Sequence, residues 1–194
     1  MKHLYKKDIF PNIIVFVTLI ISAWGFLWSL FEYGLTDLRY FTNLSNLFVF
    51  VTVFLVFINR HDKKWFKYLA VITLVNITMT GVIYHVMLAT PPLAFQSHLT
   101  HTLTPIIYVL FYFTCIDDAI KLKQFWISLV FPLIYFLFFI ITGPSTGFYP
   151  YGFMNVTENG ITEVMKFVGL ILVPAITVIS IFFIFIKSLG HKKI

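Results

Sequence analysis

The sequence predicts an all-α, polytopic membrane protein with six transmembrane helices and with both the N- and C-termini in the cytoplasm. Three features lead to this fold class: the high apolar content, the spacing of the apolar stretches and the distribution of the basic residues. Of the 194 residues, 59% are hydrophobic and only 11% are charged, and the mean hydropathy is +0.90. A soluble domain of this length cannot bury so much apolar surface, so we expect a lipid bilayer as the solvent.

Six apolar stretches each have roughly the ~20 residues that cross the ~30 Å hydrocarbon core of a bilayer. They cover residues 9–31, 40–58, 66–88, 98–115, 125–142 and 164–186. The alternating polarity of a β-barrel is absent, and a helix satisfies its own backbone in lipid. The first stretch is too long for the apolar core of a signal peptide, so we interpret it as a retained span. The length fits one transmembrane domain over residues 1–194.

The basic residues predict the orientation of these spans. Of the 14 Lys and Arg residues, all but Arg39 and Lys166 fall on one side of the predicted membrane. By the positive-inside rule this side is cytoplasmic; chance alternation among short loops is the alternative. The net charge of +6 therefore fits a multi-pass protein of the cell membrane, with membrane lipids and not nucleic acid as partners. The residues on the cytoplasmic side are Lys2, Lys6, Lys7, Arg60, Lys63, Lys64, Lys67, Lys121, Lys123, Lys187, Lys192 and Lys193.

Three connections, residues 32–39, 89–97 and 143–163, are then expected on the outer face. The third connection is long for a helical bundle and is rich in turn signals, among them residues 149–152. One interpretation is a lid over the outer face, with Tyr149 as a substrate-binding residue. The other is that its aromatic side chains anchor the protein in the membrane interface.

Polar side chains from three spans are expected at a similar depth below the outer surface. They are Thr42, Ser45 and Asn46 in the second span, His85 in the third, and His98 and His101 in the fourth. On α-helices, the first three share one face, as do the two histidines. Ionisable groups in apolar spans are costly and usually face the bundle interior or a cavity. The sequence therefore predicts a site at the outer end of the bundle.

Each of these side chains also has a structural alternative. The Thr42 hydroxyl could bond a carbonyl of its own helix, and the asparagines, Asn43 among them, could join helices through hydrogen bonds. His85 could lie in the interface and His98 could face water. His101 lies nearly a full turn further into its span, so a functional role is the stronger interpretation for this residue.

Two chemistries could use these groups. In the first, His101 removes the proton of the Thr42 hydroxyl, which then attacks an ester carbonyl. Asn46 or Ser45 could stabilise the resulting oxyanion, and His98 could support the orientation.

In the second chemistry, His85, His98 and His101 bind a metal ion with water in the open position. A His-x-x-His pattern is a weak motif, and the metalloprotease signature of two histidines with a Glu between them is absent. Cys115 is the single cysteine, so no Cys-based zinc site is expected. We therefore expect no metal and no cofactor.

A non-enzymatic small transporter, channel or sensor is a further alternative. Asn76, Thr78 and Thr80 extend the polar positions deeper along the third span, and Thr52 does so on the second. Mostly apolar residues lie between these positions, which favours a polar pocket closed at its inner end over a continuous route.

Three segments together are similar to a known family. They are Arg39-Tyr40-Phe41-Thr42-Asn43, His98-Leu99-Thr100-His101-Thr102 with Pro105, and Gly147-Phe148-Tyr149-Pro150-Tyr151-Gly152-Phe153-Met154. In this order and spacing, the chain resembles the androgen-induced protein / ADTRP family of multi-span membrane proteins and its predicted bacterial six-span relatives.

This resemblance implies threonine hydrolase chemistry on fatty acid esters of hydroxy fatty acids. The essential Thr of the family corresponds to Thr42, and the essential His corresponds to His101; the first His of the motif corresponds to His98. The resulting prediction is an integral membrane hydrolase of a lipid ester, whose substrate lies within the bilayer and reaches the site from the outer leaflet. Arg39 could hold a carboxylate or phosphate of that substrate, or could contact phospholipid headgroups.

Overall fold

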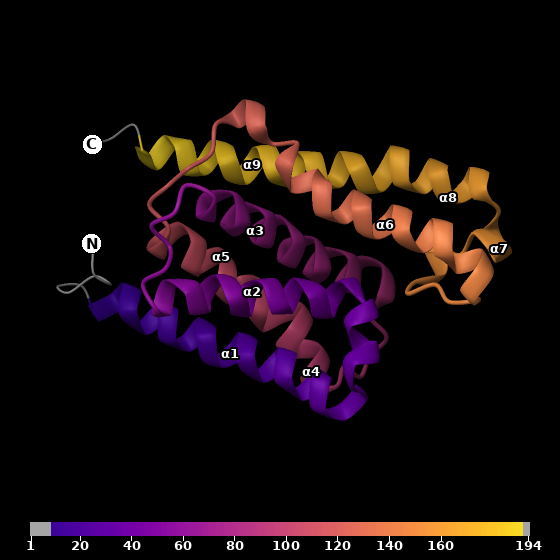
Figure 1. Ribbon diagram of the computed structural model, residues 1–194, viewed down its shortest axis with the longest axis horizontal. Coiled ribbons are helices and arrows are strands. Elements are labelled where there is room, and N and C mark those ends of the chain that lie inside the picture. The colour runs from indigo at the N-terminus through magenta and orange to yellow at the C-terminus, as the bar shows by residue number, and fades with distance from the viewer. Residues whose placement is uncertain (1–8, 192–194) are drawn as a thin grey trace. The chain divides into compact units, whose positions relative to one another are not determined.

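The computed structural model describes residues 9–191, and over this range the chain is helical and contains no strand (Figure 1). Each of the six predicted apolar stretches is helical. Four helical segments are long and apolar enough to cross a membrane: Ile9–Tyr33, Phe66–Leu88, Leu122–Thr146 and Ile161–Gly190. This is the architecture expected of a multi-pass membrane protein. The basic residues Lys2, Lys6, Lys7, Lys192 and Lys193, which support the predicted topology, lie outside the described residues.

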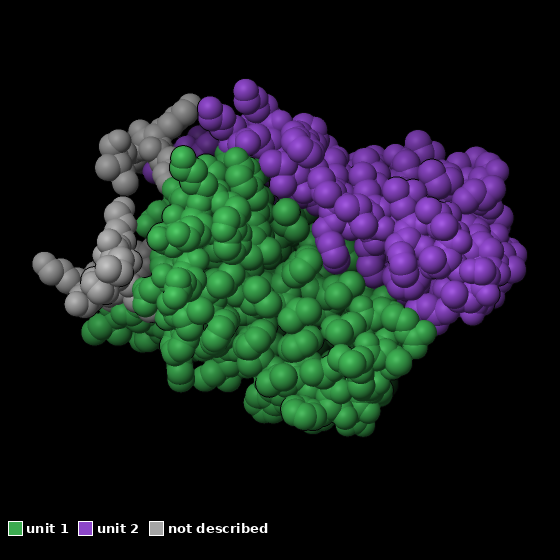
Figure 2. All heavy atoms as spheres, in the orientation of Figure 1, with its two compact units in different colours: residues 1–120 green, residues 121–194 purple. Residues whose placement is uncertain are grey.

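Backbone contacts divide the chain into two compact units, Met1–Ile120 and Lys121–Ile194 (Figure 2). The division falls in the basic connection after the fourth apolar stretch. Compact units of this kind need not be separate domains, so the single domain over residues 1–194 stays a prediction. All the predicted site residues except Tyr149 belong to the first unit.

The first unit is built around four helices. They are α1 (Ile9–Tyr33), α2 (Phe41–Phe57), α3 (Phe66–Ile83) and α5 (Thr104–Cys115). Helix α1 packs against α2 and α5, and α3 packs against the same two helices. The side chains between them are buried, as those of Val49, Leu74 and Tyr108 show. The helices therefore enclose a common core, and one end of this core carries the predicted site.

Short non-α segments complete the first unit. A 3-10 turn, η1 (Leu35–Arg39), leads into α2, and a π-helical turn, η2 (Tyr84–Leu88), ends α3. Before α5 come α4 (Phe95–His98) and a second π-helical turn, η3 (Leu99–Leu103). Both π-helical turns carry predicted site histidines.

Pro105, at the start of α5, explains the irregular geometry of η3. Proline has no backbone N–H, so it cannot donate to the carbonyl of His101, four residues earlier. That carbonyl faces Gly81 of α3: a Cβ added at Gly81 would lie only 3.0 Å from the His101 oxygen and 3.3 Å from Pro105 Cγ. Glycine at this position therefore allows α3 to approach η3 closely.

The second unit contains α6 (Ile127–Thr146), α8 (Ile161–Phe167), η6 (Val168–Leu172) and α9 (Val173–His191). Helix α6 packs against α9. The short turn η4 (Leu122–Gln124) precedes α6, and η5 (Gly152–Met154) and α7 (Val156–Asn159) lie between α6 and α8.

The predicted connection 143–163 is shorter in the structure, because α6 continues past Pro144 to Thr146. It stops at Gly147, whose φ of 68° is the left-handed conformation that commonly ends a helix.

The close approach at Gly81 generates a stability prediction. We expect Gly81→Leu to lower the thermal midpoint of the purified protein, because the added side chain has to push α3 away from η3, at a cost of about 1–3 kcal/mol. Gly169→Leu is the matched control, since a Cβ at Gly169 meets no atom within 4 Å. A midpoint for Gly81→Leu at or above that of Gly169→Leu would contradict this packing.

Candidate functional site

The Thr42 hydroxyl and the His101 imidazole lie within hydrogen-bonding distance. Thr42 is in the first turn of α2 and His101 is in η3, so two distant segments of the sequence supply the pair. The distance from Thr42 Oγ1 to His101 Nε2 is 3.3 Å, and both side chains are half-buried. The structure thus brings together the two residues predicted to be nucleophile and base, while their chemical roles stay predictions.

The other ring nitrogen of His101 is held by the preceding turn. Nδ1 lies 3.1 Å from the carbonyl oxygen of Ser97 and 2.9 Å from Oγ1 of Thr100. The Thr100 hydroxyl donates to the Gln96 carbonyl at 3.0 Å, so it can only accept from His101, as the Ser97 carbonyl does. We therefore assign the proton to Nδ1. This tautomer leaves Nε2 as an acceptor facing the Thr42 hydroxyl.

Tyr84 fixes the plane of the imidazole. Its ring stacks on His101 with a centroid separation of 3.8 Å and an interplanar angle of 19°. Tyr84 is the first residue of η2, so the end of α3 contributes to the site through an aromatic face. With both nitrogens and one face in contact, the ring has little freedom to rotate away from Thr42.

Asn46 joins the two backbone segments that carry the pair. Its Nδ2 donates to the Thr42 carbonyl at 2.8 Å and to the Thr100 carbonyl at 3.3 Å, across from α2 to η3. Asn46 and Ser45 are both fully buried. Asn46 Oδ1 and Ser45 Oγ have no hydrogen-bond partner among the described residues. The amide of Asn46 is therefore engaged in positioning the pair, and not in donating to an oxyanion.

Asn43 has a different role from that of its neighbours. It donates from Nδ2 to the Asp37 carbonyl at 3.0 Å and to Asp37 Oδ2 at 2.7 Å, and Ser29 of α1 donates to the same carboxylate oxygen. These bonds fasten η1 to α1 and α2. Arg39, also in η1, is exposed and donates from Nε to the Thr36 carbonyl at 3.0 Å. Asp37 was missed by the sequence analysis, which considered only the basic residue of this connection.

His98 and His101 do not behave as one helical face. The prediction rested on α-helical spacing, but residues Leu99–Leu103 form a π-helical turn, which holds more residues per turn. His98 is exposed, whereas His101 is half-buried against Thr42. No hydrogen bond joins His98 to either member of the pair.

His85 forms a second His–Thr contact beside the first. Its Nε2 lies 2.9 Å from Thr102 Oγ1, and the side chain is exposed. Both residues line a groove of about 400 Å³ between the α3–η2 and η3–α5 segments, which His101 also lines. The remaining lining is largely apolar, with Val82, Ile106 and other aliphatic side chains. A largely apolar groove therefore lies next to the candidate pair.

Polar side chains continue from the site into the bundle. Thr52 of α2 and Thr73 of α3 are 3.1 Å apart through their hydroxyls, and the Tyr108 hydroxyl donates to the Ala70 carbonyl at 3.1 Å. Asn76, one turn from Thr73, is fully buried, and neither its Nδ2 nor its Oδ1 has a hydrogen-bond partner among the described residues. The interior of the first unit thus contains several buried polar side chains between its apolar residues.

The remaining predicted residue, Tyr149, lies in the second unit. Its ring packs against Gly143, where a Cβ would not fit, and its hydroxyl is 3.1 Å from Thr157 Oγ1. These contacts fold the connection 143–163 on itself. Across residues 9–191, no three His, Cys, Asp or Glu side chains group closely enough to hold a metal ion.

Comparisons of the chain with protein-family models, with curated proteins and with solved structures found no match. The likeness to the androgen-induced protein / ADTRP family therefore stays a prediction that rests on the three sequence segments alone.

Substitutions at two asparagines test whether Asn46 holds α2 and η3 together. We expect Asn46→Leu to lower the thermal midpoint. The substitution removes one hydrogen bond within α2, to the Thr42 carbonyl, and one between α2 and η3, to the Thr100 carbonyl, which together contribute about 1–2 kcal/mol. Asn76→Leu is the matched control: the residue is equally buried, but its amide bonds no described residue, so we expect an unchanged or higher midpoint. Equal losses for the two variants would show that Asn46 does not bridge α2 and η3.

Proposed function

We propose that this protein is an integral membrane hydrolase of lipid esters. In this proposal it crosses the cell membrane six times, with both termini in the cytoplasm, and the Thr42–His101 pair lies near the outer leaflet. Thr42 is the nucleophile and His101 is the general base. The observation that carries the proposal is the contact of Thr42 Oγ1 with His101 Nε2, the nitrogen to which we assign no proton, at 3.3 Å.

The reaction follows from this arrangement in two steps. Thr42 Oγ1 attacks the ester carbonyl while its proton passes to His101 Nε2, and the C–O bond to the alcohol breaks as that proton moves to the leaving oxygen. A water molecule then attacks the acyl–Thr42 ester, giving its proton to Nε2, and the carboxylic acid leaves as Thr42 recovers its proton. The hydrogen bond from Nδ1 to the Ser97 carbonyl stabilises the imidazolium that forms in both steps, in place of a carboxylate.

The groove beside the pair supports a substrate with an apolar chain. Its lining is mostly aliphatic, so an acyl chain can move from the bilayer into it without burying an unpaired polar group. His85 and Thr102 supply polar contacts within this groove. The resemblance to the androgen-induced protein / ADTRP family points to the same class, fatty acid esters of hydroxy fatty acids. The substrate reaches the groove from within the bilayer, and no cofactor takes part.

The polar interior favours one second candidate, a small transporter or sensor. Asn76 is buried without a partner among the described residues, and such a group inside a helical bundle often marks a path for a polar solute. A substitution at Asn76 distinguishes hydrolysis from transport. Asn76→Leu is expected to leave ester hydrolysis unchanged, whereas a transport route through the bundle would lose its polar lining.

The proposed topology is tested by cysteine labelling in intact cells. In a Cys115→Ser background, we expect a membrane-impermeant maleimide to label Thr36→Cys and Glu158→Cys. Asp62→Cys and Asp118→Cys should react only after the membrane is permeabilised, because these exposed positions lie in connections on the basic side. Labelling of residue 62 in intact cells would show that the orientation is the opposite of the one proposed. Labelling of both residue 36 and residue 118 in intact cells would contradict six spans.

The catalytic pair is tested by hydrolysis of a panel of lipid esters in detergent. We expect Thr42→Ala and His101→Ala to lower kcat/KM by about 100-fold to 10,000-fold, the usual contribution of a nucleophile–base pair. Thr114→Ala and His98→Ala are the matched controls. Thr114 is half-buried and bonds the Leu110 carbonyl of its own helix at 2.7 Å, and His98 is exposed; neither contacts the pair, so both variants should retain wild-type rates. Full activity in Thr42→Ala would remove Thr42 from the mechanism.

A further inference from the structure

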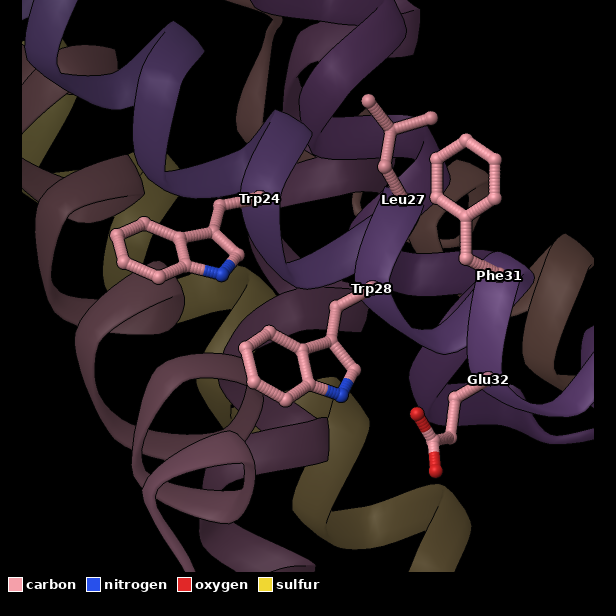
Figure 3. Close-up of a pocket in the computed structure, with 5 residues that line it drawn as sticks. All are labelled: Trp24, Leu27, Trp28, Phe31 and Glu32. Atoms are coloured by element: carbon pink, nitrogen blue, oxygen red, sulfur yellow. The ribbon is translucent and has the colours of Figure 1, made fainter.

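A second pocket, of about 330 Å³, lies along the last turns of α1 (Figure 3). Its lining consists of Trp24, Leu27, Trp28, Phe31 and Glu32. None of these residues takes part in the Thr42–His101 site or in the groove beside it. The combination of two indoles with a carboxylate stands out on a helix as apolar as α1, whose other exposed side chains are aliphatic or aromatic except for Asn12.

The helical spacing places the three key side chains in one stripe. Trp24, Trp28 and Glu32 follow each other at intervals of four residues, so they lie one above another on α1. Figure 3 shows both indoles and the carboxylate pointing to the same side of the helix, with Trp28 between the other two. The indoles are 47% and 43% exposed, which leaves large parts of their surfaces open to a ligand.

The deeper end of this stripe is held in place. The Trp24 ring lies 5.7 Å from the ring of Phe95 in α4. The next residue, Gln96, donates from Nε2 to the Gly25 carbonyl of α1 at 3.2 Å. Because α4 is fastened to α1 at this point, Trp24 is a fixed wall of the pocket.

The electrostatics select a cationic ligand. Glu32 is exposed and forms no ion pair with any of the residues 9–191, so its charge is available. Indole faces carry negative potential and attract ammonium groups, with quaternary ammonium ions as favoured ligands. Since Glu32 also repels anions, phosphatidylglycerol and other anionic headgroups are poor ligands here. Trp28 and Glu32 are one helical turn apart, about 6 Å along the axis, so a trimethylammonium group can contact the Trp28 indole and the Glu32 carboxylate together.

We propose that Trp28 and Glu32 bind the choline headgroup of a zwitterionic phospholipid, and that Trp24, one turn deeper, extends the aromatic surface along the same lipid. Glu32 stands near the end of a helix that is long and apolar enough to cross a membrane, so we place it at the depth of lipid headgroups, with Trp24 about 12 Å deeper beside the acyl chains. This site is independent of ester hydrolysis at Thr42. If the two tryptophans were only interfacial anchors, they would show no headgroup preference.

Competitive lipid binding to the full-length protein tests the site. The purified protein is delipidated in detergent and incubated with equal amounts of phosphatidylcholine and phosphatidylglycerol, and the bound lipids are counted by native mass spectrometry. We expect the wild type to retain phosphatidylcholine in preference. Trp28→Leu and Glu32→Gln should each lower its retention about threefold to tenfold, a range typical of cation–π contacts. Trp28→Phe should fall between Trp28→Leu and the wild type.

Matched controls separate headgroup recognition from other effects. Trp65→Leu removes an indole of similar exposure, 51%, and Glu158→Gln removes another exposed carboxylate; neither should change the lipid ratio. Thr42→Ala should lower hydrolysis by about 100-fold to 10,000-fold but keep phosphatidylcholine bound. Tetramethylammonium ions should displace the lipid if the ammonium group is recognised. Equal retention of the two lipids by the wild type, or retention that tetramethylammonium and both variants leave unchanged, would overturn the proposal.

Discussion

The His101 imidazole is held through both ring nitrogens and one face, and the proposed chemistry depends on this arrangement. The Ser97 carbonyl and the Thr100 hydroxyl fix the proton on Nδ1, so that Nε2 presents a lone pair to Thr42. Tyr84 stacks on the ring and prevents it from turning away. A half-buried imidazole without these partners would be costly in a membrane; with them, its orientation is set before any ligand arrives, as the proposed role of a general base requires.

The backbone around the site is adapted to this arrangement. Pro105 interrupts the α-helical hydrogen bonds before α5, and the π-helical turn η3 takes up the extra residue while Thr104 donates from its hydroxyl to the Leu99 carbonyl at 2.9 Å. Gly81 lets α3 reach the freed His101 carbonyl. Asn46 then ties η3 to α2. π-Helical turns inside α-helices are frequent at functional sites because they re-aim individual side chains.

The positions of the helices and of the Thr42–His101 pair could be predicted from the sequence. Two features of the site could not, for physical reasons. Hydrophobicity alone located the six helical stretches, and helix ends placed Thr42 and His101 at a common depth. The separation of His98 from His101 could not be predicted, because it results from a π-helical turn caused by one missing backbone N–H at Pro105. The contact between Asn43 and Asp37 was equally hidden, since it depends on how a short 3-10 turn folds back on two helices.

Trapping of the acyl–Thr42 intermediate tests whether Thr42 is the nucleophile. The wild-type protein is mixed with a slowly hydrolysed fatty acyl ester, quenched in acid during turnover, and digested for peptide mass spectrometry. Our account predicts a mass increase equal to one acyl group on the peptide that contains Thr42, localised to that residue by fragmentation. Turnover of the ester with the acyl group on another residue, or with no adduct at any quench time, would contradict the assignment of Thr42 as the nucleophile.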